Sequence, residues 1–177
     1  MEYIYHYSSP LGGITIASNG IEITGLWFDG QKYFADTLSK VHEEKALPVF
    51  DETKKWLDIY FNGTPPDFTP PLSMNTTPFR KAVWNILLGI PFGKTMTYGE
   101  ISKIIAKQFG IDKMSAQAVG GAVGHNSISL IIPCHRVVGT NGSLTGYAGG
   151  LEKKVWLLTM EKVNLSKLFV PKTGTAL

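Results

Sequence analysis

Four prolines within ten residues, in the stretch TPPDFTPPLS from 64 to 73, constrain the fold of this chain more than any other feature. Proline locks φ and removes a backbone donor, so such a run forms neither a helix nor a central strand. The stretch is typical of an extended linker. We therefore place a domain boundary here, with one domain over residues 1–73 and a second over residues 74–177.

The residues before the linker have the pattern of a small β-sheet with helices. GGITIAS and IEITGLWF alternate apolar and polar positions, and the pair Asn19-Gly20 between them predicts a two-residue hairpin. Two helices are predicted to follow. One covers residues 31–44, and the other begins at an Asp51 N-cap and ends at Gly63.

The residues after the linker are predicted to be mainly helical. One helix is expected to begin at an N-cap at Thr77, and another at a capping box of Thr97 and Glu100. The second helix is expected to end at Gly110, and KMSAQAVGGAVG is expected to form a third helix after a short turn. The second and third helices together suit a helix-turn-helix. LEKKVWLLTMEKV, residues 151–163, predicts a last helix.

Composition and charge narrow the class of protein only broadly. With 177 residues, of which 44% are hydrophobic, the chain can bury a core in one domain or two small ones. No apolar run approaches the length of a membrane span, and MEYIYHYSSP lacks the features of a secretory signal, so a cytoplasmic protein without membrane association is expected. The net charge of +3 permits a polyanionic partner without demanding one.

The single cysteine, Cys134, lies between Pro133 and His135 in LIIPCHRVVG. One cysteine excludes an internal disulfide. The preceding ISLII predicts a short buried strand or an extended segment. A neighbouring histidine can make a thiol nucleophilic by lowering its pKa from about 8.5, provided that a turn brings both side chains to one site. These residues alone favour an inert buried thiol and leave the nucleophile as the alternative.

Three further features could belong to such a site. Glu161 takes an apolar position of the last helix, where a carboxylate needs a partner such as His135; a solvated glutamate near the helix end is the alternative. Asn126 is either a turn residue or a buried amide. In the small-residue helix, Gln117 is the one long polar side chain, which disfavours base reading in the major groove and leaves two packed core helices as the alternative. No histidine shows metal-ligand spacing, so no metal site is expected.

Together these motifs resemble the O6-alkylguanine-DNA alkyltransferase (methylated-DNA–protein-cysteine methyltransferase) family. IPCHRVVG, TPFRKAVWNILLGIPFGKTMTYGEIS, AVGGAVGHN and YAGG with WLLTMEK carry the resemblance over residues 77–163. It implies an α+β fold: a small N-terminal β-sheet domain with helices, ribonuclease-H-like, then a mainly helical C-terminal domain containing a helix-turn-helix. The implied function is DNA repair by direct reversal, in which an alkyl group passes once from O6-alkylguanine to Cys134 without a cofactor.

The resemblance also implies roles for single residues. Cys134 attacks the alkyl carbon, His135 takes the thiol proton through a water, and Glu161 orients His135. Asn126 holds the turn that presents the cysteine, and Tyr98 helps to rotate the base out and delivers a proton to the leaving guanine. Implied substrate contacts come from Tyr147, Val137, Ala148 and Val123. Implied DNA contacts come from Tyr98, Ser115, Ala116, Gln117 and Gly121. The implied partner is double-stranded DNA, bound through its minor groove by a monomer.

Two positions depart from the family pattern. Gln117 stands where an arginine is usual, which predicts weaker base flipping or weaker DNA affinity. Ala148 stands where many relatives have serine, which removes a possible hydroxyl donor to O6. A non-catalytic protein that binds DNA damage and a thiol hydrolase with a Cys-His-Glu triad are the alternative functions.

Overall fold

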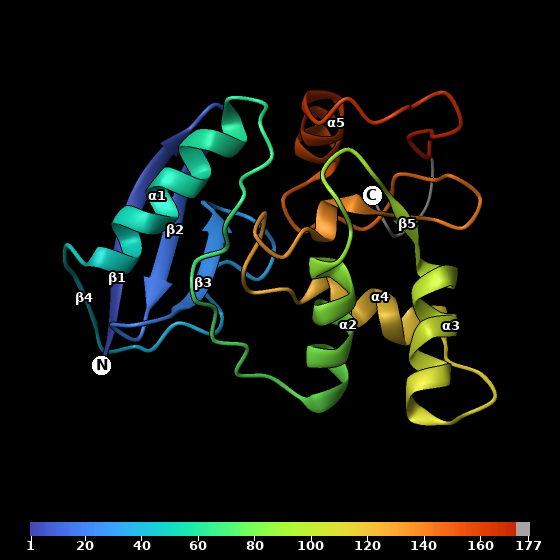
Figure 1. The fold of residues 1–177 in the computed structure, drawn as a ribbon, viewed down its shortest axis with the longest axis horizontal. Helices are drawn as coiled ribbons and strands as arrows, with labels where there is room; N and C mark the ends of the chain where they lie inside the picture. The colour runs from blue at the N-terminus through green and yellow to red at the C-terminus, as the bar shows by residue number, and fades with distance from the viewer. Residues whose placement is uncertain (173–177) are drawn as a thin grey trace. The chain divides into compact units, whose positions relative to one another are not determined.

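The computed structural model describes residues 1–172, which form two compact units (Figure 1). Unit 1 comprises Met1–Asn75 together with Ser127–Ile131, and unit 2 comprises Thr76–Asn126 and the described residues from Ile132 onward. Within residues 1–172 no helix is both long enough and apolar enough to cross a membrane.

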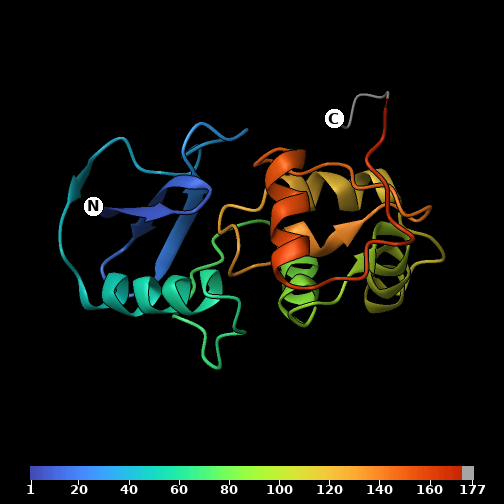
Figure 2. The same ribbon diagram turned by 90° about the horizontal axis from the view of Figure 1, so that it is seen from above.

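Unit 1 is built on a four-stranded sheet with the strand order β3-β2-β1-β4. Strands β1 (Glu2–Ser9), β2 (Gly12–Ser18) and β3 (Ile23–Phe28) pair antiparallel in sequence order, and β4 (His42–Glu44) adds to β1 in parallel. Helix α1 (Pro48–Phe61) lies along the sheet, as Figures 1 and 2 both show. The β-rich pattern predicted for the first thirty residues is confirmed.

The core of unit 1 comes from the apolar positions of β2, β3 and α1. Ile16 of β2 faces Leu26 of β3 in the register, and both side chains are fully buried. From α1, the rings of Trp56 and Tyr60 stack with centroids 5.2 Å apart and are also buried. Nearly every residue from Ile14 to Ser18 of β2 and along β3 is buried, so both faces of these two strands are covered, although the sequence alternates.

The hairpin between β2 and β3 forms, but its loop is longer than the predicted two residues. The Oδ1 atom of Asn19 accepts the backbone N–H groups of Ile21 and Glu22 at 3.0 and 2.8 Å, and the N–H of Asn19 donates to the carbonyl of Glu22. This side-chain turn adds two residues to the loop, while Gly20 takes the left-handed φ of 108°.

The predicted helix over residues 31–44 is wrong. Residues 31–41 form successive turns, and residues 42–44 form β4. Tyr33 and Ala35 have φ values of 58° and 51°, which a right-handed helix excludes. The apolar residues at helical spacing do not form a buried stripe, because Phe34 and Val41 are 40% and 64% exposed and only the ring of Phe34 contacts a core ring, that of Trp27. Apolar spacing with so little burial did not produce a helix.

Helix α1 begins earlier than predicted. Its N-cap is Leu47, with Pro48 at the first helical position and no side-chain cap, so Asp51 lies in the first turn rather than before it. A carboxylate there still favours the helix dipole. The end of the helix is close to the predicted one, and Gly63 follows it with a φ of 82°.

Unit 2 is mainly helical. Its helices are α2 (Pro78–Leu88), α3 (Tyr98–Phe109), α4 (Ala116–Gly124) and α5 (Leu151–Met160), with the 3-10 turn η1 (Cys134–Arg136). Two short parallel strands, β5 (Met96–Thr97) and β6 (Val137–Val138), join the start of α3 to the residues after η1. All four predicted helices are present, but α4 begins at Ala116 rather than at residue 113, and α5 ends at Met160 rather than at residue 163, where Lys162 has a left-handed φ of 59°.

The helix ends of unit 2 follow the predicted signals. The Thr77 side chain accepts the N–H of Arg80, which caps α2. At α3 the Thr97 hydroxyl accepts the N–H of Glu100 at 3.1 Å, and the Glu100 carboxylate accepts the N–H of Thr97 at 2.8 Å. Gly110 ends α3 in the left-handed conformation. Local side-chain chemistry therefore sets where these helices begin and end.

The segment before the cysteine returns to unit 1. The N–H of Leu26 donates to the carbonyl of Ser127, and the N–H of Ser129 donates back to the carbonyl of Leu26. Ser127–Ile131 makes a single bridge rather than a strand, because Leu130 turns the chain with a φ of 69°. The outer edge of β3 thus holds the chain just before it reaches Cys134.

The capping box of α3 gives a test of this local control. We expect Thr97→Ala to lower the free energy of unfolding by about 1 kcal/mol, because it leaves the N–H of Glu100 without its acceptor. Urea unfolding measures the change. The matched control is Thr159→Ala, an exposed threonine whose hydroxyl only donates to the carbonyl of Val155 in its own helix. Equal effects of the two substitutions would contradict the capping role.

Candidate active site around Cys134

Cys134 is the first residue of η1 and is 5% exposed. Its N–H donates to the carbonyl of Ile132 at 2.8 Å, and the N–H of Arg136 donates to the carbonyl of Pro133 at 3.0 Å. These two bonds form the turn that the proline predicted. They bring the thiol, the imidazole of His135 and the guanidinium of Arg136 into one short buried segment.

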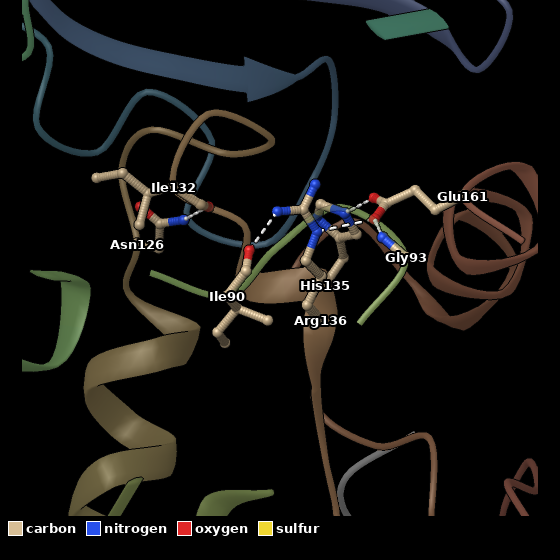
Figure 3. A network of polar contacts seen from close by, with 7 residues as sticks. All are labelled: Ile90, Gly93, Asn126, Ile132, His135, Arg136 and Glu161. Atoms are coloured by element: carbon tan, nitrogen blue, oxygen red, sulfur yellow. Dashed lines mark hydrogen bonds and ion pairs between the residues drawn. The ribbon is translucent and has the colours of Figure 1, made fainter. Parts of the chain in front are cut away.

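Asn126 is a buried amide rather than a solvated turn residue. Its Nδ2 donates to the carbonyl of Ile132 at 2.7 Å, and the residue is 4% exposed (Figure 3). This bond joins the two ends of the excursion Ser127–Ile131. The Asn126 side chain also makes a hydrogen bond that favours the thiolate form of Cys134. Asn126 therefore fixes the entry to η1 and touches the thiol.

Glu161 and His135 are in contact inside unit 2. Nε2 of His135 lies 2.5 Å from Oε2 of Glu161, and the two residues are 0% and 2% exposed. Glu161 is the C-cap of α5, so the apolar stripe of that helix carries its carboxylate inward (Figure 3). The structure thus brings together the pair that the angular position of Glu161 suggested.

Two further donors meet the same carboxylate, and no pattern in the sequence indicates either of them. Nε of Arg136 donates to Oε1 of Glu161 at 2.8 Å, and the N–H of Gly93 donates to the same oxygen at 2.9 Å. Burial alone would raise the pKa of Glu161, but the hydrogen bond from His135, the charge of Arg136 and the hydrogen bond from the Gly93 N–H outweigh it and lower the pKa to about 2. Glu161 is therefore an anion at any physiological pH.

Burial sets the protonation states of the other two groups. It raises the pKa of Cys134, against the hydrogen bond from Asn126 and the charge of Lys154. It also lowers the pKa of His135, an effect that Arg136 and Lys154 reinforce and Glu161 opposes. The resting site is therefore a thiol beside a neutral imidazole, the protonation state in which a histidine can act as a base.

Lys154 is a second buried cation that sequence reasoning missed. Its side chain is fully buried, and Nζ donates to the carbonyls of Val137 at 2.6 Å and Thr145 at 2.8 Å. Burial lowers the pKa of Lys154 to about 8, while the nearby Cys134 acts in the opposite direction. The signal was present: Lys154 lies seven residues before Glu161, on the same stripe of α5.

Two tyrosines border the thiol. The hydroxyl of Tyr147 is buried and has no hydrogen-bond partner among the described residues, and its ring lies edge-on to His135 with centroids 6.3 Å apart. The hydroxyl of Tyr98 donates weakly to the carbonyl of Thr145 at 3.4 Å. Burial, with the nearby Cys134, raises the pKa of Tyr98 to about 12 and also raises the pKa of Tyr147 well above its usual value. Both hydroxyls keep their protons at neutral pH.

The remaining candidates fall into two groups. Val137 and Val123 are buried, and Ala148 is half-buried in the loop after β6. The others are exposed residues of α4 and its N-cap: Ser115, Ala116, Gln117 and Gly121. A groove between α3 and the start of α4 also carries three lysines, Lys103, Lys107 and Lys113, which sequence reasoning missed.

No group of three or more His, Cys, Asp and Glu side chains that could hold a metal ion occurs within the described part of the chain. The side chains gathered at the site are one nucleophilic sulfur, one neutral base fixed by a carboxylate, and two phenolic proton donors.

Two family models match the chain. Residues 78–163 match the DNA binding domain of 6-O-methylguanine DNA methyltransferase, and residues 3–74 match its ribonuclease-like domain. A methylated-DNA–protein-cysteine methyltransferase of Haemophilus influenzae is 41% identical over 162 residues, covering 91% of this chain and 87% of that protein. A protein of the same name from Mycobacterium tuberculosis is 41% identical over 160 residues, covering 89% of this chain and 92% of that protein.

Solved structures of proteins from the same family also resemble this chain. The crystal structure of Mycobacterium tuberculosis OGT in complex with DNA superposes with a TM-score of 0.78 at 38% identity, covering 90% of this chain and 92% of that one. An O6-methylguanine-DNA methyltransferase from Pyrococcus kodakaraensis superposes with a TM-score of 0.60 at 25% identity, covering 92% of this chain and all of that one. The α+β fold class expected from the sequence is confirmed.

The lowered pKa of Glu161 predicts a pH dependence of stability. A carboxyl group whose pKa falls on folding, here from 4.5 to about 2, stabilises the fold above pH 4.5 and loses this contribution as the pH falls towards 2. We expect Glu161→Gln to be clearly less stable than the wild type at pH 7, with a difference that shrinks between pH 5 and pH 3. Urea unfolding at each pH measures it.

The matched control is Glu152→Gln, the same chemical change at an exposed position of α5. It should leave the free energy of unfolding nearly unchanged at every pH. A Glu161→Gln deficit that stays constant down to pH 3 would contradict the ionised state assigned to Glu161.

Proposed function

This chain belongs to the 6-O-methylguanine DNA methyltransferase family, and from that membership we infer that it repairs DNA by direct reversal. The alkyl group of an O6-alkylguanine passes to a cysteine of the protein, and we propose that this cysteine is Cys134. The observation that carries the proposal is the contact of His135 with Glu161, one residue beyond a buried thiol, within the matched domain.

The proposed reaction uses only groups of this chain and the lesion. His135 takes the thiol proton of Cys134, through a water. The sulfur then forms a bond to the sp³ alkyl carbon, the bond from that carbon to O6 breaks, and its electron pair stays on the guanine. The guanine anion takes a proton from the hydroxyl of Tyr98. The proton that His135 took from the thiol then returns to the Tyr98 oxygen. Thiol and alkylguanine thus become thioether and guanine, and no oxyanion hole is needed.

Asn126 and Glu161 have supporting parts in this scheme. Asn126 holds the backbone of Ile132 just before the nucleophile, and Glu161 fixes the ring of His135 through Nε2. Nothing among these groups is placed to cleave a thioether. Each molecule is therefore proposed to react once.

The pocket for the flipped base is proposed beside Tyr147. Its buried hydroxyl without a partner is an unusual cost in a folded protein, which a hydrogen bond to a bound base would remove. Val123 and Ala148 would line the same pocket. The carbonyl of Val137 would accept from the guanine amino group, although it already accepts from Lys154. Ala148 offers O6 only its backbone N–H.

For DNA, we propose that α3 and α4 act as a helix-turn-helix whose second helix enters the minor groove. Three observations support this: the exposed small side chains of α4, the Ser115 cap at its N-terminus, and the lysines of the adjacent groove. Small residues allow close approach to the groove, and lysines contact phosphates. Gln117, in place of the usual arginine, would fill the vacated base position less well.

We also propose that the protein acts as a monomer in the cytoplasm. All groups that the reaction needs come from one chain, so no partner copy is required. A reducing compartment keeps the acceptor cysteine free for its single reaction.

Mass spectrometry tests the proposed reaction. After incubation with a duplex that contains one O6-methylguanine, we expect the intact protein to gain one methyl group, carried by the peptide that holds Cys134. Cys134→Ser is expected to bind the duplex without any gain in mass. Tight binding by the wild type with no gain in mass would instead indicate a non-catalytic damage-binding protein.

Substitution of Gly121, an exposed glycine of α4, is expected to change stability and DNA binding in opposite directions. A Cβ at Gly121 meets no atom within 4 Å, and its φ is not in the left-handed region. Gly121→Ala should therefore stabilise the protein by about 0.5–1 kcal/mol, because alanine is the better helix former. In the proposed complex the added methyl group would lie between α4 and the minor groove of the DNA, so we expect weaker binding to duplex DNA.

Thermal unfolding and fluorescence anisotropy measure the two effects. Gly124→Ala is the matched control, because its Cβ also meets no atom within 4 Å but lies at the end of α4. Unchanged DNA affinity of Gly121→Ala would exclude close approach of this part of α4 to DNA.

A further inference from the structure

Arg136 is a buried charged residue for which the proposed reaction has no role. It is 8% exposed, and its Nε donates to Oε1 of Glu161 at 2.8 Å (Figure 3). The two oxygens of the carboxylate have different partners. Oε1 accepts hydrogen bonds from Nε of Arg136 and the N–H of Gly93, while Oε2 contacts Nε2 of His135.

The guanidinium has two more anchors besides the carboxylate. Nη1 donates to the carbonyl of Ile90 at 2.7 Å, and Cζ lies 5.8 Å from the centroid of the Phe92 ring. The turn after α2 therefore holds both the arginine and, through Gly93, the carboxylate. A fork of this kind fixes direction as well as charge, which a lysine cannot do.

We propose that Arg136 is a positioning residue that carries the counter-charge of Glu161 and thereby leaves the imidazole of His135 uncharged and able to accept the thiol proton. The proposal deepens the function given above and rests on it. If Arg136 only formed a structural salt bridge with Glu161, its loss would not change the protonation of His135. In the proposed role, its loss does change the protonation of His135.

The charge balance around the buried carboxylate supports this division. Without Arg136, Glu161 would be a buried anion whose nearest available proton site is the imidazole of His135, and such an anion needs compensation. A proton on His135 would supply it. Burial lowers the pKa of His135 first, and the positive charge of Arg136 lowers it further. Loss of that charge removes one of the forces that keep the ring neutral.

The other charged or titratable groups facing this ring are few. From η1 there is Cys134, from α5 there are Lys154 and Glu161, and from the loop after β6 there is Tyr147. Lys154 acts in the same direction as Arg136 but bonds to backbone carbonyls rather than to Glu161. It therefore cannot replace the contact at Oε1.

The test is an NMR titration of the His135 ring in the folded, DNA-free protein. In the wild type we expect His135 to ionise only below its ordinary pKa of about 6.5. Arg136→Met and Arg136→Gln both remove the charge, and the second keeps an amide donor in case the first does not fold. Each should raise the pKa of His135 by about one unit or more.

Two further variants separate charge from structure. Arg136→Lys keeps the charge and should leave the titration of His135 unchanged. Lys94→Met removes an exposed cation next to Gly93 and should also leave it unchanged. A titration of His135 that does not move in the folded neutral variants would overturn the proposal, and so would an equal shift in Arg136→Lys.

Methyl transfer from O6-methylguanine duplex gives the second readout. The neutral variants should lose about tenfold more rate at pH 6 than at pH 8, because a protonated His135 cannot accept the thiol proton. An equal loss at both pH values would indicate a structural role alone and overturn the proposal. If the wild type transfers no methyl group at all, the proposed function fails, while the titration still decides the role of Arg136.

Discussion

The buried carboxylate of Glu161 is the interaction on which the rest of the site depends. A carboxylate that is 2% exposed is stable only if strong donors meet it, and here they come from two segments other than its own. His135 and Arg136 belong to η1, Gly93 belongs to the turn after α2, and Glu161 itself ends α5. One anion therefore holds together the parts of unit 2 that surround the thiol.

The same burial defines the chemistry. Exclusion of water keeps Cys134 as a thiol and His135 as a neutral base, while Glu161 stays ionised because its donors outweigh its desolvation. The proton then has to move when the substrate arrives, rather than being absent from the sulfur beforehand. A soft nucleophile activated in this way suits displacement at an sp³ carbon and leaves a thioether that the site cannot reverse.

Local signals in the sequence predicted local structure well. The caps at Thr77 and Thr97 and the end of α3 at Gly110 depend on neighbouring residues, so the sequence contains their cause. The helix predicted over residues 31–44 does not form, because two of its apolar positions, Phe34 and Val41, stay exposed and give no continuous buried stripe. The return of Ser127–Ile131 to β3 depends on residues a hundred positions away, which no local pattern reveals.

Some residues of the site also have a local signal in the sequence, and others do not. The apolar angular position of Glu161 pointed to His135, and the identical argument would have found Lys154. Arg136 and Gly93 carry no such signal, because their contacts depend on how η1 meets the turn after α2.

A single transfer of the alkyl group to one sulfur can be followed with an excess of an O6-methylguanine duplex whose methyl carbon is ¹³C-labelled. We expect one new ¹³C resonance at the shift of an S-methyl thioether, which rises to one equivalent per chain and then stops. Release of labelled methanol with continued turnover, or a label that stays on O6, would contradict it.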